Sequence, residues 1–93
     1  MSIVIIGGNE CMECQYRALC RAHGHRAKVF TRMQAALRRQ IGEPDMMIFF
    51  TNTVSHKMIQ CAMAEVRGKS TIIERCHSSS ASALKSILAR YPL

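Results

Sequence analysis

The sequence contains no tryptophan, only 5% aromatic residues and two prolines in 93 residues. Its core must therefore be filled by Ile, Val, Leu, Ala and seven methionines. No apolar run approaches the roughly 20 residues that cross a bilayer. The first residues also lack the charged and long apolar segments of a secretory signal. From these absences we expect a cytoplasmic protein without membrane contact.

Acidic residues are scarce, with six Asp and Glu against 13 Lys and Arg and a net charge of +7. No acid occurs from residue 17 to residue 39. This asymmetry favours an anionic ligand, a nucleic acid or an acidic partner, and the alternative is a solvated face that only keeps the protein soluble. The basic residues of this stretch are Arg17, Arg21, Arg26, Lys28, Arg32, Arg38 and Arg39.

Four short runs, at 3–6, 26–30, 46–50 and 71–74, have the β-branched or apolar composition of strands. Helical periodicity follows each of them, at about 11–23, 33–41, 54–67 and 80–91. The connections are short, and no linker or repeat interrupts the pattern. We therefore predict a single domain, residues 1–93. Small size and an apolar final helix favour a homodimer.

The alternation of strands and helices predicts an α/β fold, a small Rossmann-like or flavodoxin-like three-layer domain. Right-handed crossovers place helices on both faces of a four-stranded parallel sheet. Residues 26–30 alternate polar with apolar side chains, as an edge strand does, whereas 3–6 and 46–50 are apolar throughout. The predicted strand order is thus 2-1-3-4, with the switch point between the first and third strands.

Polar residues follow three of the predicted strands, and we call this set the rim. The carboxyl ends of parallel strands lie at one edge, so these residues are expected to converge on a small anionic ligand, either a phosphorylated metabolite or a nucleotide. The alternative is that they form turns, helix caps and solvent-exposed histidines. The predicted ligand contacts are Gly8, Asn9, Asn52, Thr53, Ser55, His56, Ser78, Ser79 and Ser80.

Cysteine and histidine near the same rim support a second hypothesis, a metal, haem or thiol-redox site. Its residues would be Cys11, Cys14, His56, Cys76 and His77. The five cysteines are odd in number and irregularly spaced, which favours free thiols over a secreted disulfide framework. Cys20 and Cys61 fall on apolar helical stripes and are expected to fill the core.

Two further functions remain open. A cysteine-phosphorylated carrier would use Cys11, because some sugar-phosphotransfer domains share the 2-1-3-4 sheet with a cysteine after the first strand. Nucleic-acid binding would use the basic stretch and is the weaker alternative, because no aromatic stacking platform is evident. Glu10 and Glu13 are the only acids near the rim, and both suit the start of a helix better than paired-acid catalysis.

Several segments resemble the small bacterial family catalogued as domain of unknown function 2325 (DUF2325). They are IVIIGGNECMECQY, AKVFT, PDMMIFFTNTVSHKM and HSSSASAL, which together cover most of the chain. The most specific parts are Thr51 to Met58 and His77 to Ala83. The resemblance implies a small Rossmann-like α/β domain, in agreement with the strand count, and it brings no settled activity or ligand.

Overall fold

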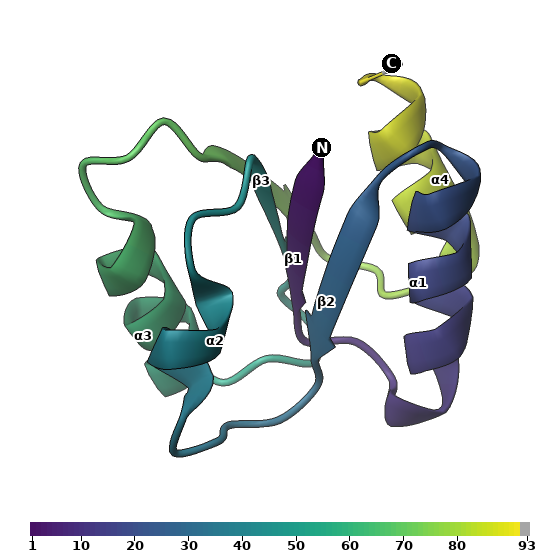
Figure 1. The fold of residues 1–93 in the computed structure, drawn as a ribbon. Coiled ribbons are helices and arrows are strands. Elements are labelled where there is room, and N and C mark those ends of the chain that lie inside the picture. Colours follow the sequence, from purple (N-terminus) through teal and green to yellow (C-terminus); the bar gives the residue numbers. More distant parts are fainter. Residues whose placement is uncertain (92–93) are drawn as a thin grey trace.

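A computed structural model describes residues 1–91, so Pro92 and Leu93 lie outside the described part (Figure 1). Its sheet has four parallel strands in the order β2-β1-β3-β4. This confirms the predicted order and the predicted α/β class. The strands are β1 (Ser2–Ile6), β2 (Arg26–Phe30), β3 (Met46–Phe50) and β4 (Ile72–Cys76).

The helices form a layer on each face of the sheet (Figure 1). On one face α1 and α4 pack against each other, and on the other face α2 packs against α3. None of the helices in residues 1–91 is long and apolar enough to span a membrane. The helices are a 3₁₀ turn η1 (Glu10–Met12), α1 (Glu13–Ala22), α2 (Leu37–Ile41), α3 (His56–Val66) and α4 (Ala81–Ala89).

The core consists of two buried clusters, one on each face of the sheet. Successive strand residues point to opposite faces, so the continuous apolar run of β3 supplies both clusters. Its Met46, Ile48 and Phe50 face α1 and α4. Met47 and Phe49 face α2 and α3. All five residues of β3 are buried, as expected for a central strand.

The two outer strands are less covered than the two central ones. Along β2 the odd-numbered Ala27 and Val29 pack towards α1, while Arg26 and Lys28 are exposed. This agrees with the predicted edge position. β4 forms the other edge and is only partly buried along its length. The free edge of β2 therefore carries cations on the face of the sheet opposite α1.

Several boundaries differ from those predicted, most clearly in the second helix. The prediction of 33–41 is too long, because α2 covers only Leu37–Ile41 and has no side-chain cap at its start. Its two buried residues, Leu37 and Ile41, are one turn apart, so packing supports a single turn. β4 runs to Cys76 rather than 74, because Cys76 pairs with Phe50 at the end of β3.

Candidate functional site

The loops after β1 and β3 meet at the carboxyl edge of the sheet through a direct hydrogen bond. The Gly8 N–H donates to Thr53 Oγ1 at 2.7 Å. The same hydroxyl donates to the Phe50 carbonyl at 3.1 Å. Two residues of the predicted rim are thus adjacent, although they are 45 positions apart in the chain. Because the Gly8 N–H already donates to Thr53, it is not available to bind an anion.

Gly7 and Gly8 are required by the packing of this edge itself. Both have positive φ, 98° and 94°. A Cβ on Gly8 would lie 2.7 Å from Cε2 of Tyr16, and one on Gly7 would lie 3.0 Å from the Phe50 carbonyl oxygen. The space that the glycines leave is therefore filled by side chains and backbone of the protein.

Tyr16 joins the loops after β1 and β4. Its side chain is fully buried, and its ring centroid lies 5.2 Å from that of Phe50. The hydroxyl donates to the Ser79 carbonyl at 2.6 Å and accepts the Asn9 N–H at 3.2 Å. This role was not predicted from the sequence, where Tyr16 lies within the helical periodicity of residues 11–23. The signal was its hydroxyl, which needs a partner when it is buried.

Three predicted ligand contacts act as helix caps. Asn9 Oδ1 accepts the Cys11 N–H at 2.9 Å, at the start of η1. Ser55 Oγ accepts the Met58 N–H at 3.2 Å and caps α3. Ser80 Oγ accepts the Ala83 N–H at 3.1 Å and caps α4. These acceptors satisfy helix-start amides, so the capping alternative accounts for this part of the rim.

The remaining rim side chains are more open. Asn52, His56 and Ser78 are exposed, and Ser79 is half-buried. The Ser78 hydroxyl lies 3.1 Å from that of Ser80, and His56 Nε2 lies 3.1 Å from Gln60 Nε2. His56 begins α3, whereas Ser79 precedes α4 on the other face of the sheet. The rim is therefore one edge that carries two helix starts.

The cysteines are all free thiols in the described chain. Cys11 and Cys14 are exposed, while Cys76 is half-buried. Within residues 1–91 no group of three or more His, Cys, Asp or Glu is arranged to hold a metal ion, so the five residues of the metal hypothesis do not form such a group. Cys20 is buried in the core as predicted, and burial raises its pKa to about 11.

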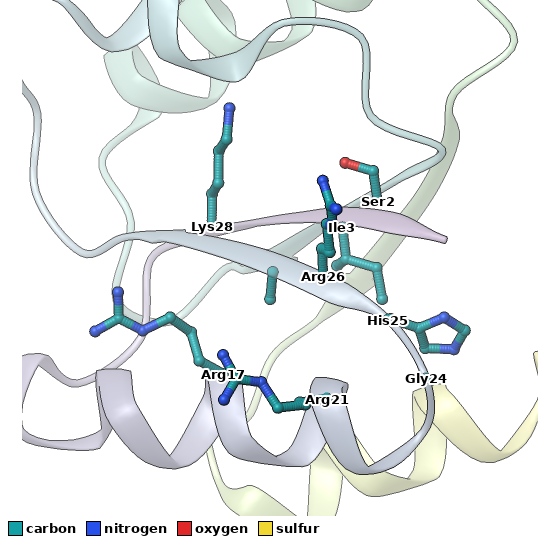
Figure 2. Close-up of a pocket in the computed structure, with 9 residues that line it drawn as sticks. Ser2, Ile3, Arg17, Arg21, Gly24, His25, Arg26 and Lys28 are labelled. Atoms are coloured by element: carbon teal, nitrogen blue, oxygen red, sulfur yellow. The ribbon is translucent and has the colours of Figure 1, made fainter.

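A cleft lies away from the rim, along the outer edge of β2. It encloses about 730 Å³ and is lined by residues of α1 and of the amino-terminal halves of β1 and β2 (Figure 2). Four members of the predicted basic stretch line it, namely Arg17, Arg21, Arg26 and Lys28. Sequence analysis identified their charge. It did not predict that α1 and β2 would arrange them around one cavity.

Comparison with known proteins gives one match. The family model described as "Uncharacterized protein conserved in bacteria (DUF2325)" matches residues 2–91 of the 93-residue chain. The searches of curated proteins and of solved structures each found no significant match.

Proposed function

The chain belongs to the DUF2325 family, and we propose that it is a cytoplasmic binding or sensing module for a small anionic ligand held at the rim. The ligand class is a phosphorylated metabolite or a nucleotide. The observation that carries the proposal is the direct bonding of three loops at one sheet edge, through Gly8 to Thr53 and through Tyr16 to Ser79. This is the edge at which open α/β sheets bind ligands.

The bonded loops lead into two helix starts at the same edge, one on each face of the sheet. β3 and β4 are paired neighbours, and α3 and α4 begin directly after their loops. The first amides of a helix have no intrahelical partner and carry partial positive charge, which favours an anion. Ser55 and Ser80 each satisfy one amide of their helix by capping. The other first-turn amides are available for a ligand.

The predicted contacts divide into two roles under this proposal. Gly8, Thr53 and the three caps position the loops, because their polar groups are used within the protein. The direct contacts would be made by side chains whose hydrogen-bonding capacity is still open. These are Asn52, His56, Ser78 and Ser79.

Thermal shift measurements test this function with Ser79→Ala. Nucleotides, sugar phosphates and inorganic phosphate are compared with potassium chloride at matched ionic strength. A ligand that binds only the native state raises Tm, and the rise grows with the logarithm of one plus the ratio of ligand concentration to Kd. We expect at least one phosphorylated compound to raise the Tm of the wild type, and Ser79→Ala to remove most of that shift. Ser86→Ala, an exposed serine on α4, is the matched control and should keep it.

The proposal is wrong if every anion produces the shift that chloride produces at the same ionic strength. It is also wrong if Ser79→Ala and Ser86→Ala bind a stabilising anion equally, because the rim hydroxyl would then make no contact. His56→Ala provides an independent check at the start of α3. Its loss of affinity should exceed that of Gln60→Ala, since Gln60 only contacts the imidazole.

A further inference from the structure

The cleft along the outer edge of β2 is surrounded by cations from two elements. Figure 2 shows Arg17 and Arg21 extending from α1, and Arg26 and Lys28 extending from β2 on the other side of that strand. All four residues are exposed. A ligand lying along the free edge of β2 would therefore have a pair of cations on each side.

Carboxylates do not neutralise this cleft. None of the four cations forms an ion pair within residues 1–91, and five of the six acids have their partners outside the lining of the cleft, the exception being Asp45 beside Ser2. Four acids pair with Arg32, Arg38, Lys69 and Arg90. The other two, Glu13 and Asp45, accept hydrogen bonds from the Thr31 hydroxyl and the Ser2 N–H. The positive potential of the cleft is thus left for an external anion.

The cations of the cleft also have few contacts within the protein. Arg17 Nη2 lies 3.9 Å from Cys14 Sγ, and Lys28 Nζ donates to the Gln40 carbonyl at 2.9 Å. For Arg21 and Arg26 the described chain contains no side-chain hydrogen bond. A guanidinium presents its donors in a fixed fork that matches two phosphate oxygens. Both arginines are therefore free to bind phosphate in this way.

His25 adds a buried polar atom to the same lining. The residue is 4% exposed, and its Nδ1 lies 2.9 Å from the Met1 amino group. Its Nε2 has no hydrogen-bond partner within the described residues. Burial lowers the pKa of the imidazole, the positive charge of the Met1 amino group lowers it further, and the Tyr91 backbone opposes this shift. Figure 2 shows its ring directed away from the four cations, so His25 forms part of the wall and the anion contacts rest on the arginines and Lys28.

We propose that this cleft is a second binding site, distinct from the rim, for a small ligand that carries two or more linked phosphate groups. The volume of about 730 Å³ lies within the roughly 300 to 1,000 Å³ of small-molecule sites. Among the described residues that line the cleft there is no Phe, Tyr or Trp on which a base could stack, so recognition rests on the phosphates. Inorganic polyphosphate and nucleoside polyphosphates share this chemistry.

Isothermal titration calorimetry tests the proposal with tripolyphosphate, ATP and orthophosphate at fixed ionic strength. The test variant is Arg21→Gln/Arg26→Gln, with one substitution on each side of the free edge. The control is Arg67→Gln/Arg75→Gln, which removes the same charge from two exposed positions. Arg67 follows α3, and Arg75 lies in β4. We expect tripolyphosphate to bind the wild type at least tenfold more tightly than orthophosphate. The test variant should lose at least tenfold in affinity, and the control should lose less than threefold.

Comparison of ATP with tripolyphosphate separates the two ligand sources. Tighter binding of ATP would assign the cleft to nucleoside polyphosphates, and equal binding would assign it to the polyphosphate group alone. Equal losses in the test variant and the control would overturn the proposal, because net charge rather than the cleft would then bind the ligand. Tenfold tighter binding of a single-stranded 12-mer oligonucleotide than of tripolyphosphate would also overturn it, in favour of a nucleic-acid surface.

The two sites can be separated, because the cleft is lined from the amino-terminal halves of β1 and β2 and the rim lies at the carboxyl ends. Ser79→Ala should leave tripolyphosphate binding unchanged. If it abolishes that binding while Arg21→Gln/Arg26→Gln does not, the cleft proposal fails and the rim proposal stands. Circular dichroism and Tm of every variant verify that it is folded.

Discussion

The Tyr16 hydroxyl donates a 2.6 Å hydrogen bond to the backbone carbonyl of Ser79, 63 positions further along the chain. The bond connects α1 with the loop that leads into α4. The same oxygen accepts the Asn9 N–H at 3.2 Å. One buried side chain thus fixes the relative positions of two rim loops, and the shape of the rim depends on a residue of the core.

Removal of this hydroxyl should destabilise the fold. Tyr16→Phe keeps the ring against Phe50 but leaves the Asn9 N–H and the Ser79 carbonyl without their partner. Unsatisfied groups of this kind cost about 1 to 3 kcal/mol. Urea unfolding should show a loss of that size. Tyr91→Phe is the control and should lose less, because its hydroxyl has a single partner and Glu74 keeps its ion pair with Arg90. Equal losses would contradict a special role for Tyr16.

Alanine substitution of Gly8 and of Gly68 should reduce stability by different amounts. Gly8→Ala must place a Cβ 2.7 Å from the Tyr16 ring at a φ of 94°. Gly68→Ala imposes a similar positive φ of 80° but meets nothing within 4 Å. Backbone strain costs roughly 1 to 2 kcal/mol in both variants, and the clash adds about 1 to 3 kcal/mol in Gly8→Ala alone. Chemical denaturation measures the difference. A Gly8→Ala variant as stable as Gly68→Ala would show that Tyr16 can move aside without cost.

The fold could be predicted from the sequence because the burial pattern of the strands, which is the clearest pattern in the chain, also determines their order. The apolar runs at β1 and β3 must be buried on both faces, and the alternation in β2 requires an edge, so the strand order follows. The convergence of loops at the rim followed from topology. Helix capping was one alternative for the rim residues, and Ser55 and Ser80 adopt it. The bond from Gly8 to Thr53 could not be predicted, because it depends on which amide that hydroxyl reaches after folding.

The cleft could not be predicted from the sequence either. The basic stretch was visible in the sequence, but its members separate into paired and unpaired cations only in three dimensions. Arg32 and Arg38 are neutralised by Glu10 and Glu65, which lie outside the stretch. Arg21 and Arg26 have no such neighbour in the described chain. Local composition therefore overstates the positive charge around Arg32 and Arg38. It also cannot show that Arg21 and Arg26 lie at the same cleft.

His25 makes a prediction about pH. Burial lowers the pKa of its imidazole below the ordinary value of 6.5, and the positive charge of the Met1 amino group lowers it further. The folded protein therefore holds neutral His25 at a pH where the unfolded chain already binds a proton. The contribution of neutral His25 to stability is complete above about pH 6.5 and is lost as the pH falls through the lowered pKa.

Urea unfolding at pH 7.5 and pH 5.0 measures this effect. The wild type should lose stability between the two values, and His25→Gln should lose less because the titrating group is gone. His23→Gln should keep most of the loss of the wild type, because His23 is the smallest of the causes that lower the pKa of His25. A pH dependence that is identical in His25→Gln and in the wild type would show that other groups cause it.

The cysteines differ in environment, and alkylation should report the difference. Burial raises the pKa of Cys20 from an ordinary 9.0 to about 11, so almost no thiolate is present at pH 8 and the sulfur is also inaccessible. Cys11 and Cys14 are exposed on η1 and α1. Because the thiolate is the reactive form, iodoacetamide at pH 8 should modify these two first and leave Cys20 unmodified in the folded protein.

Mass-spectrometric peptide mapping over time would follow this order, and labelling in urea, where all five thiols should react, is the control. Modification of Cys20 as fast as Cys11 in the folded protein would mean that α1 opens frequently. Because α1 supplies both Tyr16 and Arg21, such opening would loosen the rim and the cleft together. The alkylation rate of Cys20 thus reports how often α1, which contributes to both proposed sites, opens.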